Sequence, residues 1–117
     1  MSSPYYEEYR KLSQNMTANG FLAHVWLDYG TKGMEERLIA AAEILKGYGE
    51  PALVALLKYK DRHEMEYFMT TIAGLEGVAR SEREVALRTF LNHKNPEIAH
   101  AAVNALAELR AQKTDVL

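Results

Sequence analysis

The sequence predicts an all-α protein, an antiparallel stack of helical hairpins with about seven helices. Apolar residues recur at intervals of three and four almost throughout, as in amphipathic helices, and the alternation typical of strands does not persist. The breaks between apolar segments are two to five residues long, and such short links force neighbouring helices to run antiparallel. A pair of helices recurs at a period near 31 residues, which is typical of stacked repeats.

The recurrence defines a single domain over residues 1–117. A shift of 31 positions pairs Ala55 with Ala86 and Leu56 with Leu87, and it also pairs Ile72 with Val103. We therefore expect an N-terminal helix over residues 1–16, hairpin repeats over 17–47, 50–78 and 81–110, and a frayed tail over 112–117. In the first repeat, two registers one residue apart fit the later second helices equally well.

The first three helices are bounded by residues that cap or break helices. Pro4 after Ser3 opens the first helix, because the first turn does not need the N–H that proline lacks. The second helix runs from about residue 17 to 29, where Gly30 suits a left-handed cap, and the third runs from about 34 to 46 and stops at Gly47. Their expected core-facing residues are Tyr5, Tyr9, Leu12, Phe21, Leu22, Val25, Trp26, Leu38, Ala41, Ala42 and Leu45.

The remaining helices carry similar signals. Pro51 lies just inside the fourth helix, which is apolar on nearly all sides and is expected to be covered on both faces. The fifth is expected over residues 62–78. Ser81 and Glu84 predict a capping box for the sixth, and Asn95 followed by Pro96 predicts the start of the seventh. Their expected core residues are Met65, Phe68, Met69, Ile72, Leu75, Val85, Leu87, Phe90, Leu91, Ile98, Ala102, Ala105, Leu106 and Leu109.

The segment NPEIAHAAVNALAEL, residues 95–109, resembles the second helix of a HEAT-type repeat. That pattern has a turn ending in proline, a β-branched residue, two alanines and a leucine at helical spacing, and here these are Pro96, Ile98, Ala101-Ala102 and Leu106. The family usually carries a polar ladder of Asp in the turn and Arg in the second helix, where this chain has Asn95 and Ala99, so the resemblance is to a divergent member.

The resemblance implies a right-handed α–α superhelix. HEAT-like proteins chiefly bind other proteins on a concave face lined by their second helices. A few bind DNA, and some act as chromophore lyases or as chaperones of chromophore proteins. These three activities are the functions that the resemblance raises for this chain.

Charge and composition argue against some of these functions and partners. The net charge is −2, and acidic residues interrupt the basic stretch around Lys58, Lys60 and Arg62, so nucleic acid is an unlikely partner. Cysteine is absent, which fits a reducing compartment. We find no signal peptide and no apolar run approaching the roughly 20 residues that cross a bilayer. We therefore expect a cytoplasmic protein with no membrane partner.

Neither catalysis nor metal binding is expected. None of the histidines pairs with another at the helical spacing of metal ligands; they are His24, His63, His93 and His100. The paired carboxylates all lie at predicted helix starts, where the helix dipole favours negative charge. We therefore expect a non-enzymatic protein without a cofactor.

The candidate binding surface is the stripe that the core residues leave free on the second helices. Small residues flanked by polar ones form a shallow groove there, in which a peptide or a helix can lie, although a plain solvent face would have the same pattern. The candidate binding residues are Glu66, Tyr67, Thr70, Glu97, His100 and Asn104.

Tyrosines near the N-terminus form a second candidate surface, because Tyr5, Tyr6 and Tyr9 cannot all face the core of one helix. The leading functional hypothesis is a protein-binding module: an adaptor, a regulator or an immunity-type protein. One alternative is a lyase or chromophore chaperone with a pocket around Trp26, His24 and Asp28. Others are nucleic-acid binding and self-association through the ends of the stack.

Overall fold

Helices and their connecting turns make up the part of the chain that the computed structural model describes, residues 4–28, 30 and 33–112. The fold over these residues is all-α, as predicted. The elements in chain order are α1 (Pro4–Ser13), α2 (Ala18–Leu27), α3 (Met34–Lys46), α4 (Glu50–Lys58), the 3₁₀-helix η1 (His63–Phe68), α5 (Met69–Ala73), α6 (Arg80–Arg88) and α7 (Pro96–Ala111). The expected helix start at Ser3 and the tail beyond Gln112 lie outside the described residues.

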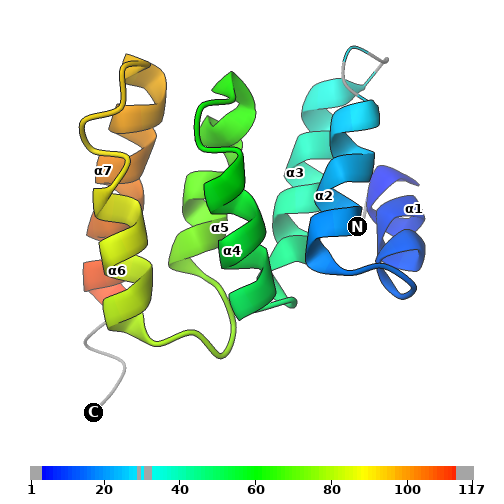
Figure 1. The fold of residues 1–117 in the computed structure, drawn as a ribbon, viewed down its shortest axis with the longest axis horizontal. Coiled ribbons are helices and arrows are strands. Elements are labelled where there is room, and N and C mark those ends of the chain that lie inside the picture. The colour runs from blue at the N-terminus through cyan, green and yellow to red at the C-terminus, as the bar shows by residue number, and fades with distance from the viewer. Residues whose placement is uncertain (1–3, 29, 31–32, 113–117) are drawn as a thin grey trace.

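The helices form two layers (Figure 1). In this view α2, α4 and α6 lie nearer the viewer, and α3, α5 and α7 lie behind them. In the rear layer α1 packs on α3, α3 on α5 and α5 on α7, while η1 contacts both α3 and α7. In the front layer α2 packs on α4. The second helix of each predicted hairpin, namely α3, η1 with α5, and α7, therefore lies beside the next one along the chain.

Small buried residues let these second helices approach closely. Ala41 and Ala42 on α3, Ala73 on α5 and Ala102 and Ala105 on α7 are all buried. On α5 the hydroxyl of Thr71 donates a hydrogen bond to the carbonyl of Ala42 on α3 at 3.2 Å. The predicted core stripe of α7 is confirmed, because all five of its residues are buried; they are Ile98, Ala102, Ala105, Leu106 and Leu109.

The 31-residue register holds for the first helices and only in part for the second ones, where Leu75 and Leu106 are both buried as it requires. Ala55, Leu56, Ala86 and Leu87 are buried in α4 and α6 as the register requires. Ile72 is buried, however, while its predicted equivalent Val103 is 53% exposed. Burial is instead matched by a shift of 33, which pairs buried residues of η1 and α5 with those of α7 (Met65 with Ile98, Met69 with Ala102, Ile72 with Ala105). The turn over residues 89–95 is longer than the turn over 59–62, and this difference moves α7 forward.

The single fifth helix expected over residues 62–78 is also a wrong prediction. It is divided into η1 and α5, and α5 ends at Ala73, where Gly74 forms the C-terminal cap. Gly77 has a φ of +75°, a left-handed conformation that glycine adopts without strain. Leu75 and Val78 are buried as expected, but they reach the core from a turn.

The predicted capping box at Ser81 does not form. Helix α6 begins at Arg80 after Ala79, so Ser81 is already inside the first turn. Instead, the guanidinium of Arg83 donates hydrogen bonds to the backbone carbonyls of Val78 and Ala73, which precede the helix. The predicted cap of α7 is confirmed, since Asn95 Oδ1 accepts a hydrogen bond from the N–H of Glu97 at 2.9 Å and Pro96 follows it.

Three apolar residues expected to be covered lie on the surface of the front layer. Val54 on α4 is 49% exposed, Val85 on α6 is 64% exposed and Leu91 is 36% exposed. These exposures arise because α2 packs on α4, whereas no comparable contact joins α4 to α6.

Among the described helices, none combines the length and the apolar character needed to cross a bilayer.

A buried histidine joins two turns at one end of the helices. The His93 side chain is 4% exposed, and its ring stacks on Phe90. Its Nδ1 accepts a hydrogen bond from the N–H of Asn95 at 3.0 Å, so the hydrogen lies on Nε2, which donates to the carbonyl of Lys60 at 2.8 Å. His93 therefore fixes the α4–η1 turn against the start of α7 and has a structural role.

Replacing His93 with phenylalanine keeps the stacked ring and removes both hydrogen bonds. We expect His93→Phe to lower the free energy of unfolding by about 1 kcal/mol, because two partly buried backbone groups lose their partners. Urea unfolding followed by circular dichroism measures the loss. The matched control is His100→Phe at an exposed position of α7, which should change stability little. Equal stability of the two variants would contradict this role.

Candidate functional site

Four of the six predicted binding residues line one shallow hollow between η1 and α7. Glu66 comes from η1, and Glu97, His100 and Asn104 come from the first turns of α7, with Pro96 and Ala101 completing the lining. Its volume is about 440 Å³. Tyr67 is half-buried on η1, and Thr70 is exposed on α5 but does not line the hollow. The hollow is open to solvent and carries carboxylates on both sides.

The α7 side of the hollow follows from local helix geometry. Asn95 caps the helix and Pro96 occupies its first turn, so Glu97 lies where the helix dipole favours a carboxylate. Residues three and four apart share a helix face, so Glu97, Ala101 and Asn104 lie together. Ala101 has no side chain beyond Cβ, and it lines the hollow together with the polar residues Glu66, Glu97 and Asn104.

The η1 side is held by a buried carboxylate in the first turn of η1. Glu64 is only 3% exposed, and Arg62 Nε lies 3.1 Å from its Oε1. The same guanidinium stacks over Trp26 at 4.2 Å from the ring centroid. Charge-assisted hydrogen bonds of this kind have well-defined geometry. The anchored Glu64 therefore fixes the short 3₁₀ turn from which Glu66 and Tyr67 project.

Tyr67 lies among three carboxylates that come from three different helices. Burial raises the pKa of the Tyr67 phenol above its ordinary value, and the negative charges of Glu35, Glu66 and Glu97 raise it further. Each carboxylate lies in the first turn of its helix: α3, η1 and α7. We call Glu35, Glu66 and Glu97 the acidic row. It crosses the second helices on one side of the molecule, with Tyr67 near its centre.

Glu35 was not among the predicted binding residues, although its spacing from Glu66 in the sequence points to it. The three carboxylates are spaced at intervals of 31 residues, the period predicted from the sequence, although the buried residues of η1 and α5 match those of α7 at a shift of 33. The groove was predicted from the last two repeats, and the first repeat had two open registers, so Glu35 was not aligned with the others. The structure adds Glu35 to the candidate site as its third acidic position.

Tyr9 does not belong to the predicted tyrosine surface. It is fully buried, and its hydroxyl donates a hydrogen bond to Asp28 Oδ2 at 2.6 Å. Burial, followed by that hydrogen bond, raises the pKa of the Tyr9 phenol well above its ordinary value. Arg37 stacks over the half-buried Tyr5 at 4.5 Å. Tyr9 is thus a core residue that joins α1 to the end of α2, and listing it as an interface residue was wrong.

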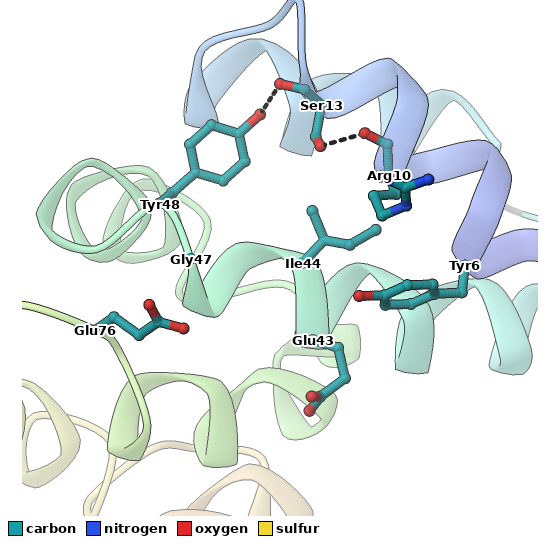
Figure 2. Close-up of a pocket in the computed structure, with 8 residues that line it drawn as sticks. All are labelled: Tyr6, Arg10, Ser13, Glu43, Ile44, Gly47, Tyr48 and Glu76. Atoms are coloured by element: carbon teal, nitrogen blue, oxygen red, sulfur yellow. Dashed lines mark hydrogen bonds between the residues drawn. The ribbon is translucent and has the colours of Figure 1, made fainter. Parts of the chain in front are cut away.

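Tyr6 borders a different hollow, between α1 and α3 (Figure 2). Figure 2 shows its ring and the side chains of Arg10, Glu43 and Glu76 around this hollow, which Tyr48 closes by donating to the carbonyl of Ser13 at 2.9 Å. Arg10 and Glu43 already form surface ion pairs, with Glu7 at 3.2 Å and Lys46 at 2.8 Å. The hollow mixes charges of both signs, and the assignment of Tyr5 and Tyr6 to an interface stays a prediction.

The alternative pocket around Trp26, His24 and Asp28 does not form as one site. Asp28 accepts from Tyr9 and from Arg37, and His24 Nε2 lies 3.8 Å from Asp28 Oδ2, so these groups face α1 and α3. Trp26 instead packs edge-on against Tyr59 and Phe68 with ring centroids 5.5 and 5.8 Å away. The three residues therefore contact two separate parts of the molecule.

Comparisons with protein-family models, with curated proteins and with solved structures find no match to this chain. The class of the molecule is therefore the one its fold defines, an all-α protein of seven α-helices over the described residues, with an acidic face on its second helices.

We expect the pKa of Tyr67 to fall toward its ordinary value in the variant Glu35→Gln/Glu66→Gln/Glu97→Gln, because three nearby negative charges are removed while burial remains. In the native chain the folded pKa lies above the unfolded one. The contribution of Tyr67 to stability is therefore complete below pH 10.0 and is lost as the pH rises through the folded value. NMR titration of ring-labelled tyrosines, assigned with Tyr67→Phe, measures the shift. An unchanged Tyr67 pKa would refute the proximity of the three carboxylates.

Replacing Tyr9 with phenylalanine should destabilise the fold without touching the acidic face. We expect Tyr9→Phe to lower the free energy of unfolding by about 2 kcal/mol, because Asp28 loses a charge-assisted hydrogen bond. Thermal unfolding measures it, with Tyr6→Phe as the matched control on the same helix. A larger loss in Tyr6→Phe than in Tyr9→Phe would show that the roles of the two tyrosines are reversed.

Proposed function

We propose that this protein is a non-catalytic interaction module, a divergent HEAT-like stack that binds a positively charged peptide or helix along its second helices. The observation that carries the proposal is the acidic row, in which Glu66 and Glu97 line one hollow and Glu35 lies in the first turn of α3, which packs on η1. A small adaptor, regulator or immunity-type protein would use such a face to hold one segment of its partner.

Two observations support the stack. Second helices pack in chain order, α3 on α5 and α5 on α7, as they would in a superhelix of hairpins. The α7 residues that carry the HEAT resemblance also have the roles which that family requires, since Ala102 is buried between helices and Pro96 opens the helix. A face lined by second helices is the surface on which proteins of this family bind other proteins.

The charges on the face favour a basic partner. Glu35 and Glu97 are exposed and Glu66 is half-buried, so a bound cation would lose little hydration at the rim and more at the centre. Tyr67 offers a ring to which the stem of a lysine or arginine side chain can pack. A nucleic acid would be repelled, because its phosphates carry the same sign of charge as the row.

The spacing of the second helices determines how far apart the basic residues of a partner segment should lie. Neighbouring packed helices lie about 8–10 Å apart, so successive carboxylates of the row are separated by about the same distance. A partner helix rising 1.5 Å per residue meets them with basic residues about seven positions apart.

The proposal is tested by titrating the protein with an alanine-based helical peptide that carries three lysines at that helical spacing. We expect saturable binding that weakens as salt is added. The variant Glu35→Gln/Glu66→Gln/Glu97→Gln should bind at least about tenfold more weakly, because three charge pairs are lost. Isothermal titration calorimetry measures both affinities.

The matched control removes the same charge elsewhere, in Glu7→Gln/Asp61→Asn/Glu84→Gln. It should bind the lysine peptide as the native chain does. A peptide with glutamate in place of each lysine should not bind. Equal losses in the two triple variants would mean that the attraction is a property of net charge, and the proposed face would be wrong.

A further inference from the structure

The front layer carries an apolar groove that the acidic face does not use. Leu53 and Leu57 of α4 form one wall, and the other is formed by α6 and the residue that caps it: Ser81, Glu82, Val85, Ala86 and Thr89. The groove is left open because α4 packs on α2 without comparable contact to α6. Val85 in its wall is 64% exposed, although a valine gains free energy by being covered.

A pair of carboxyl groups lies at one end of this groove and a lysine at the other, with Arg80 and Asp61 at the respective ends as well. At one end Glu50 and Glu82 begin α4 and α6, and their carboxyl groups are close enough to hydrogen-bond, which raises the pKa of Glu50. The other end lies at the last turns of both helices, beyond Leu57 and Thr89. There Lys60 follows α4, and its ammonium lies 5.8 Å from the centroid of the Phe90 ring that follows α6.

We infer that the groove between α4 and α6 is a self-association surface, on which a second copy of this chain docks in the opposite direction. A two-fold axis requires a patch that is complementary to itself. An antiparallel second copy would place its Lys60 end beside the Glu50 and Glu82 pair, and its Glu50 and Glu82 beside Lys60. The exposed ridge at Val85 of each copy would enter the apolar groove of the other.

The size of the groove makes this a weak dimer. Helices of nine residues are about 13 Å long, so the contact is smaller than the roughly 800 Å² per partner of a standard interface. The dimer should therefore form between micromolar and millimolar chain concentration. It differs from self-association through the ends of the stack, which would use α7 in place of α4 and α6.

Sedimentation equilibrium of the full chain over that concentration range tests the inference. The average mass should rise from 13.2 kDa toward twice that value. Val85→Gln should weaken association at least about tenfold, because an apolar ridge becomes polar. Val103→Gln, at a valine of similar exposure on α7, should associate as the native chain does. Circular dichroism checks that each variant is folded.

Swapping the charges at the two ends of the groove distinguishes docking in the groove from association through another apolar surface. Glu82→Lys and Lys60→Glu should each weaken association, because each places like charges together, and the double variant should recover it, since both pairs re-form with opposite signs. A constant mass of 13.2 kDa at every concentration would overturn the inference. That result would also be expected if a different protein, and not a second copy, covers the groove. Loss of association in Val103→Gln but not in Val85→Gln, or no recovery in the double variant, would also overturn it.

Discussion

Close approach of the second helices is the constraint on which the rest of the structure depends. Alanines at the contacts, among them Ala42 on α3, Ala73 on α5 and Ala105 on α7, are buried and let the backbones come together. Where backbones are this close, small differences in side-chain volume change the helix spacing, because protein interiors are packed at nearly crystalline density. The hydrogen bond from Thr71 to the carbonyl of Ala42 fixes the same contact in one register.

That close approach also creates the acidic face. The first turns of α3, η1 and α7 lie side by side, so carboxylates favoured individually by helix dipoles become neighbours. Among the described residues, no ion pair involves Glu35, Glu66 or Glu97. The packing of the second helices thus places negative charge where the proposed function requires it.

Much of the fold could be predicted from the sequence, and the departures have local causes. Apolar spacing predicted the buried stripe of α7, and Asn95 with Pro96 predicted its start, because both signals are contained within one helix. The end of α5 was missed because Leu75 and Val78 have core spacing but reach the core from a turn. Val85 was expected inside because spacing alone does not reveal that α4 and α6 leave a groove between them.

The candidate site was predicted in part for similar reasons. Glu66, Glu97, His100 and Asn104 were found because they share helix faces in aligned repeats. Tyr9 was expected to face the core and does, but it was also included in the tyrosine surface, because its hydrogen bond to Asp28 depends on the packing of α1 against the end of α2. Glu35 was missed because its neighbours on the face are 31 and 62 residues away in the sequence, and only the packing of three helices brings them near Tyr67.

The central claim is that the acidic row is the surface that receives a positively charged partner segment. Amide chemical-shift mapping of the labelled protein with the lysine-bearing helical peptide tests it most directly. Binding on the acidic row should shift the amides of Glu35, Glu66, Tyr67, Glu97 and His100, with little change along α2, α4 and α6. Shifts concentrated on the front layer, or spread evenly over the surface, would contradict it.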